Sequence, residues 1–232
     1  GDAAHVDLHA VGTADQFVSP NDVDGLVLRL DSTRKLLWSR WFSGPMQTSN
    51  QAVTLMDAFG LSNGAVVMAG HVGSPGNTSD KATAALVFEV DASGSLKWSR
   101  TISATGKTTR AVGLVPTGSG MMLLGSTTGY GSTRRPLLID LTTSGALQSQ
   151  LGLGAAYGAG LAGGVANSSG DVYGVGFDNQ SSGSPSPLVV KAPSLTPLAS
   201  CQGATTSGLS AGGLALTATT DLPKDTAAAA TV

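Results

Sequence analysis

A repeated segment constrains the fold of this chain more than any other feature. Residues 26–31 (LVLRLD) lead into 37–40 (LWSR), and residues 86–91 (LVFEVD) lead into 97–100 (KWSR). The two copies lie 60 residues apart, since Asp31 matches Asp91 and Trp38 matches Trp98. Weaker copies begin at 137 and 188. A repeat of this length indicates an array of supersecondary units that stack on one another.

Each unit contains four apolar, β-rich runs separated by turn residues. The units span about 5–60, 61–118, 119–169 and 170–218, and residues 219–232 are expected to form a flexible tail or linker. The predicted strands are 6–12, 26–31, 37–44 and 52–59; 65–70, 85–91, 96–103 and 110–116; 121–125, 136–141, 146–152 and 158–166; 172–176, 188–192, 198–203 and 212–218.

Short strands at even spacing favour an all-β fold, and blades of four antiparallel strands are typical of a β-propeller. Four units make either a closed four-bladed ring or part of a larger propeller. In a closed ring, the strand at 212–218 would complete the first blade as a clasp.

The turn residues support this segmentation. Asp91 can hydrogen-bond the backbone two residues on, and Gly94 can supply a positive φ, so residues 91–94 predict a hairpin turn. In the first unit Arg34 stands where that glycine would be. A glycine also follows the first strand of every unit, where neighbouring backbones are expected to approach closely. These glycines are Gly12, Gly70, Gly125 and Gly176.

Composition favours an extracellular or cell-surface protein without nucleic-acid partners. Only 12% of the 232 residues are charged and the net charge is -2, whereas nucleic-acid binding needs clustered cations. Cys201 is the single cysteine, so the chain has no internal disulfide. No apolar run approaches the roughly 18 to 20 residues of a membrane span. Gly1 is not an initiator methionine, which suits a processed chain or an excerpt of a secreted protein.

The sequence resembles a known repeat family. A strand, an Asp-x-x-Gly turn, a Trp and a short strand ending in Gly are similar to the bacterial seven-bladed β-propeller repeat of large surface and secreted proteins. Asp91, Gly94 and Trp98 match its spacing, and Asp31 and Trp38 match without the turn glycine. The resemblance implies structural roles for these five residues. Quinoprotein propellers have a similar arrangement that is one residue longer, and they rank second.

The candidate metal ligands are few. His5, Asp7 and His9 share one strand face, but residues four apart on a strand are separated by about 13 Å, too far for both histidines to hold one zinc. Asp22 and Asp24 lie in a loop similar to part of a calcium site, although the twelfth position is Thr33 rather than Glu. Asp7, Asp22 and Asp24 are therefore weak metal candidates. We predict no cofactor, with calcium as the alternative.

Two further motifs fit catalysis poorly. Ser210 lies in a Gly-x-Ser-x-Gly pattern, but a hydrolase needs a later histidine and none follows His71. The glycines at 152–158 resemble a dinucleotide-binding loop, which requires a helix that the following glycines disfavour. The chain is therefore predicted not to be an enzyme.

The tryptophans and the sequons allow a packing, binding or modification role. Trp38 and Trp98 are expected to pack between units; the alternative is a sugar-binding platform. Asn77, Asn167 and Asn179 begin glycosylation sequons in predicted turns or loops.

We therefore predict a non-catalytic, extracellular structural or adhesive module of a cell-surface or filamentous assembly, which associates with itself or with other surface proteins. The alternatives are a propeller that binds carbohydrate or protein through its variable loops at 13–25, 71–84, 126–135 and 177–187, or a quinoprotein-like enzyme.

Overall fold

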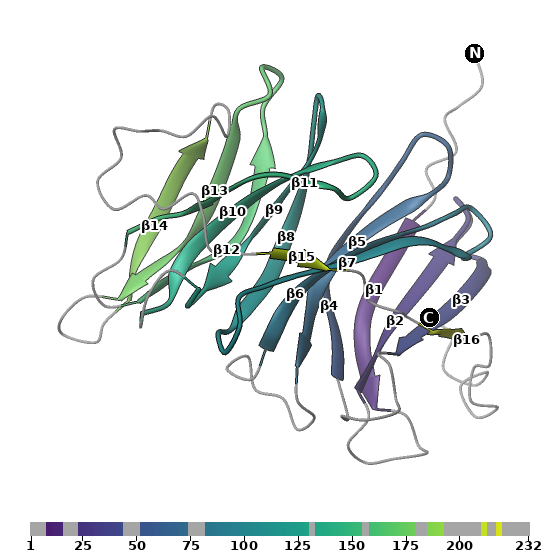
Figure 1. Cartoon of the computed structure of the whole chain (residues 1–232). Coiled ribbons are helices and arrows are strands. Elements are labelled where there is room, and N and C mark those ends of the chain that lie inside the picture. The colour runs from purple at the N-terminus through teal and green to yellow at the C-terminus, as the bar shows by residue number, and fades with distance from the viewer. Residues whose placement is uncertain are drawn as a thin grey trace.

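The computed structural model describes residues 8–15, 23–43, 52–73, 82–129, 133–154, 158–179, 185–192, 210–212 and 217–219. Every regular element in these ranges is a β-strand, and they form four antiparallel sheets that stand side by side in a fan (Figure 1). The described part of the chain contains no helix that could cross a membrane. The all-β prediction is therefore confirmed for these residues.

We name the sheets A to D in chain order. Sheet A holds β1 (Leu8–Asp15), β2 (Val23–Leu30), β3 (Leu36–Ser43) and β16 (Thr217–Thr219). Sheet B holds β4 (Ala52–Gly60), β5 (Val66–Gly73), β6 (Ala82–Val90), β7 (Leu96–Ser103) and β15 (Ser210–Gly212). Sheet C holds β8 (Thr109–Thr117), β9 (Gly120–Thr127), β10 (Arg135–Thr142) and β11 (Leu147–Gly152). Sheet D holds β12 (Ala159–Ala166), β13 (Val172–Asn179) and β14 (Pro185–Ala192).

The sheets are offset by one strand from the sequence repeats. β4 comes from the end of the first unit but pairs with β5 of the second, and β8 and β12 pair in the same way with β9 and β13. The reason is local: a tight turn at 61–65 joins β4 to β5, and such a turn brings two strands together as an antiparallel hairpin.

The expected clasp does not pair with β1. β16 joins sheet A, but it pairs with Trp41–Ser43 of β3, at the edge opposite β1. β15 pairs with β7 at the outer edge of sheet B. The free N–H and C=O groups of these outer edges explain why short strands add there. Among the described residues, the sheets therefore form a row with A and D at its ends and no closed ring (Figure 1).

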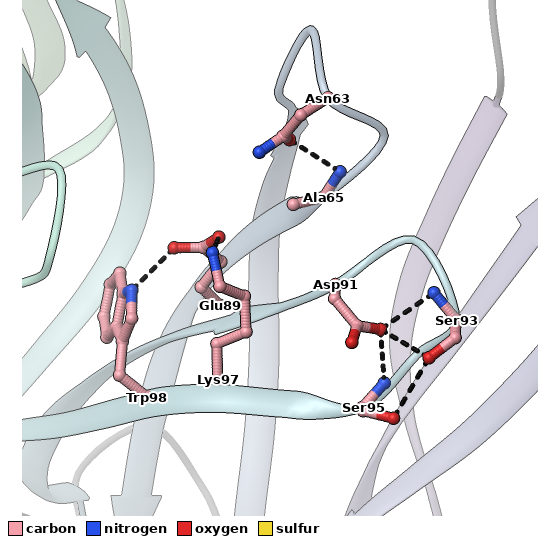
Figure 2. Close-up of polar contacts among 8 residues, drawn as sticks. All are labelled: Asn63, Ala65, Glu89, Asp91, Ser93, Ser95, Lys97 and Trp98. Carbon is pink, nitrogen blue, oxygen red and sulfur yellow. Dashed lines mark hydrogen bonds and ion pairs between the residues drawn. The ribbon is translucent and has the colours of Figure 1, made fainter.

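Five hairpin turns share one hydrogen-bond pattern. The amide of the first residue donates to the carbonyl of the fifth, and the amide of the fourth donates to the carbonyl of the first. The fourth residue has positive φ in each turn. In the turn at 91–95 the Asp91 carboxylate accepts from the amides of Ser93 and Ser95 at 2.8 and 3.0 Å (Figure 2). Gly94 has a φ of 82°, so the predicted turn chemistry is confirmed.

A second repeated device lies at the first strand of sheets B, C and D. Each of these strands bulges at one residue, namely Met56, Val112 or Ala162. The residue before each bulge pairs with the glycine predicted to follow the first strand of a sequence unit, namely Gly70, Gly125 or Gly176. A Cβ on any of these three glycines would overlap a backbone carbonyl oxygen of the neighbouring strand. The predicted close approach is thus confirmed at these three positions.

The hydrophobic core consists of three layers between successive sheets. Phe42 of sheet A meets Phe88 of sheet B with ring centroids 4.8 Å apart. Between sheets B and C, Val87 and Ile139 belong to one buried cluster. Between sheets C and D, Leu138 and Leu161 belong to another. Each sheet in the middle of the row is therefore buried on both faces, as expected for stacked sheets.

Candidate interaction surface

Trp98 contacts two sheets at once. Its indole N–H donates to Glu89 of the neighbouring strand at 2.6 Å, and the Lys97 ammonium lies 2.5 Å from the other oxygen of that carboxylate (Figure 2). On the other side, a Cβ at Gly145 in the 142–146 turn of sheet C would lie only 2.7 Å from Cε3 of the ring. The Trp98 ring therefore packs directly against the backbone of the next sheet's turn.

Trp38 occupies the matching place between sheets A and B. Its indole N–H donates to the Ala92 carbonyl in the 91–95 turn at 2.9 Å, and Arg29 donates to the same oxygen. Arg40 lies 5.7 Å from the Trp38 ring centroid and donates to the Ser93 carbonyl at 3.0 Å. Both tryptophans thus join their own sheet to the turn of the next one.

The turn aspartates are ionised hydrogen-bond acceptors. Hydrogen bonds from the Thr33 hydroxyl and the Lys35 amide hold the pKa of Asp31 below its usual value. Bonds from the Ser93 hydroxyl and the Ser95 amide lower the pKa of Asp91 in the same way. The two carboxylates lie in equivalent turns of adjacent sheets, between β2 and β3 and between β6 and β7, and each accepts hydrogen bonds from within its own turn.

The candidate metal ligands do not meet in the described residues. Asp7 and Asp22 lie outside them. Asp24 is fully buried near the start of β2 in sheet A. No group of three His, Cys, Asp or Glu side chains within the described ranges is placed to hold a metal ion.

The sequons fall at strand ends where described. Asn167 begins the exposed turn that joins β12 to β13, and its side-chain oxygen accepts from the amides of Ser169 and Asp171 at 3.0 and 2.9 Å. Asn179 is the last residue of β13. Asn77 lies outside the described residues.

The dinucleotide-like glycine segment and the Gly-x-Ser-x-Gly motif both adjoin β-strands in the described structure. The glycine-rich segment 152–158 joins β11 to β12, so it leads from strand to strand and not into the helix that a dinucleotide loop requires. Ser210 begins the short strand β15, whereas a nucleophile elbow places its serine before a helix.

Sequence reasoning did not single out His71 as a site. The side chain is 4% exposed in β5, and its Nδ1 has no hydrogen-bond partner in the described structure. Burial, with a further contribution from the positive charge of Arg110, lowers the pKa of His71 to about 4. The residue is therefore neutral at physiological pH. A histidine within the continuous apolar run at 66–73 was the available signal.

The outward faces of sheets A and D, at the two ends of the row, carry exposed apolar residues. We call the face that a sheet turns toward the following sheet its trailing face, and the opposite face its leading face. On the trailing face of sheet B, the cross-strand pair Ala69 and Val87 is completely buried under sheet C. The equivalent pair in sheet C, Leu124 and Leu138, is completely buried under sheet D.

The same pair on sheet D is uncovered. Val175 and Val189 face each other across β13 and β14, and they are 49% and 69% exposed. Val165 of β12 is 66% exposed and pairs with Tyr173 on the same face. This apolar patch, the D trailing face, has the register and the residue types of an inter-sheet core.

Sheet A presents the complementary surface. Its leading face carries Leu28 and Leu30 on β2 and Leu36 on β3. The equivalents of these residues in sheet B are Phe88, Val90 and Leu96, of which the first two are completely buried under sheet A. In sheet A, Leu36 is 42% exposed and Leu28 and Leu30 are partly buried, whereas Trp41 on the same face is only 7% exposed. We call this surface the A leading face.

No protein-family model matches this chain, and neither does any curated protein.

Proposed function

We propose that the four sheets are consecutive blades of a β-propeller, and that the protein is a non-catalytic structural or adhesive module of an extracellular, cell-surface or filamentous assembly. The exposed D trailing face carries this proposal. A soluble monomer seldom leaves a contiguous apolar sheet face open, and such patches mark interaction surfaces.

The contacts of the repeated polar residues support the same function. Asp91 accepts hydrogen bonds within its own turn, whereas Trp98 and Arg40 each contact a turn of the following sheet. These side chains build the stack, and that is the role expected of residues that recur from unit to unit.

Sedimentation analysis tests the proposal. The chain has a mass of 23.0 kDa, and at micromolar concentration we expect species heavier than this monomer. Negative-stain electron microscopy of the same sample should show rings or filaments. A sample that stays monomeric throughout this concentration range, with no ordered particles, would contradict the assembly role.

A further inference from the structure

The structure points to one specific partner for the D trailing face: the A leading face of a second copy of this chain. This inference rests on the proposed assembly function and names the surfaces that would carry it. The two copies would join head to tail, as consecutive sheets do within one chain.

The three internal interfaces identify the occupant. In each of them, the trailing face of one sheet is covered by the leading face of the next, through the same register positions. Among the described residues, the trailing face of sheet D is open, and the leading face of sheet A is open at the end of the sheet that carries Leu36. What covers a trailing face in this fold is therefore a leading face, and sheet A supplies it.

The positions of the two faces favour a second copy. Sheets A and D lie at opposite ends of the row (Figure 1), so in this arrangement one chain cannot bring its own end faces together. A contact between two different patches is heterologous, and it produces a ring if the rotation closes or a filament if it does not.

The rim of the D trailing face is compatible with burial. Lys191 lies 2.9 Å from a carboxylate oxygen of Asp171 and 5.6 Å from the Tyr173 ring centroid. This ammonium already has a counter-charge, so covering the patch does not strand an unpaired cation, which would be costly.

The end interface is expected to be weaker than the internal ones. Internally, Trp38 and Trp98 pack against glycines of the following turn. The corresponding turn of sheet A carries Arg34 in place of that glycine, with a φ of 68°. All three tryptophans of the chain lie in sheets A and B, so sheet D offers no indole to that turn, and association should be reversible at micromolar concentration.

A mixing experiment tests this arrangement. Val189→Lys places a charge on the D trailing face, and Leu36→Lys places one on the A leading face. Each variant alone should sediment as a monomer. An equal mixture should form a one-to-one dimer of about twice the 23.0 kDa monomer mass, because each variant retains the face that the other has lost.

Matched controls make the result specific. Met56→Lys changes an exposed apolar residue, 47% exposed, that lies on neither end face, and it should assemble like the wild type. Circular dichroism and thermal unfolding verify that each variant is folded. If Val189→Lys does not fold, Val165→Lys blocks the same face at a residue that is 66% exposed.

The outcomes separate this inference from the proposed function. If the folded Leu36→Lys variant dimerises by itself, the contact joins two D faces and the head-to-tail arrangement is wrong. If the blocked variants assemble like the wild type, the assembly function stands but these faces do not carry it. If the mixture stays monomeric although the wild type assembles, the inference is likewise overturned.

Discussion

The ring of Trp98 packs on the α-carbon of Gly145, across the boundary between sheets B and C. A Cβ at Gly145 would lie 2.7 Å from Cε3 and 2.8 Å from Cη2 of the indole, closer than van der Waals contact. Gly145 also has a φ of 75°, which residues with a Cβ rarely adopt. Gly145 is thus required for two reasons: its turn needs a positive φ, and the absence of a Cβ leaves space for the ring of a tryptophan from the preceding sheet.

Gly145→Ala should destabilise the protein both by straining the turn and by displacing the Trp98 ring. The left-handed conformation costs about 1–2 kcal/mol, and displacing the packed ring adds about 1–3 kcal/mol. Gly170→Ala is the matched control, because Gly170 has a φ of 82° in the same type of turn and nothing lies within 4 Å of an added Cβ. Urea denaturation would measure both variants. Equal losses of unfolding free energy would show that the Trp98 contact contributes nothing.

Trp98→Ala should lower the free energy of unfolding by about 3–5 kcal/mol, as expected when a large aromatic is removed from a core. Trp98→Phe keeps a ring against Gly145 but removes the N–H that donates to Glu89 at 2.6 Å. Because Glu89 is only 3% exposed, the loss of this donor alone should cost about 1–3 kcal/mol. A Phe variant as unstable as the Ala variant would assign the stabilisation to the hydrogen bond instead of to ring packing.

Arg34→Gly should stabilise the protein by about 1 kcal/mol. Arg34 has a φ of 68° at the position that glycine occupies in the other turns of this type, and a glycine removes the left-handed penalty at a smaller cost in unfolded-chain entropy. Ser32→Gly in the same turn is the control, since Ser32 has no positive φ and should lose stability instead. Thermal unfolding of the two variants should therefore shift the midpoint in opposite directions.

Acidification should destabilise the protein through His71. Its pKa is about 4 in the folded state and about 6.5 in an unfolded chain, so the unfolded state binds the proton first. The stabilisation is therefore complete above pH 6.5 and is lost as the pH falls toward 4, by up to about 3 kcal/mol. His71→Gln should remove this part of the pH dependence when unfolding is measured at several pH values. The test fails if both proteins lose stability equally between pH 6.5 and 4.

Local features of this protein were predictable from the sequence alone. The turn at Asp91 and Gly94 depends on a side-chain acceptor and a positive φ within five residues, so the residues themselves specify it. The close approach at Gly70 was also predictable, because a glycine at one repeated strand position indicates that a neighbour lies where a Cβ would be. Strand positions in the first two units followed from the 60-residue offset between the two best copies, whereas the predicted strand at 198–203 lies outside the described residues.

Long-range pairing decided the rest. The predicted clasp at 212–218 already implied that the last strand of each unit begins the next blade, as β4 does. The sequence does not show that β16 pairs with β3, since any open strand edge offers the same N–H and C=O groups. The burial of His71 and the exposure of Val189 depend on whether another sheet covers their faces. Val87, Leu138 and Val189 occupy equivalent positions and are all apolar, so only the tertiary structure distinguishes the two that are buried from the one that is open to a partner.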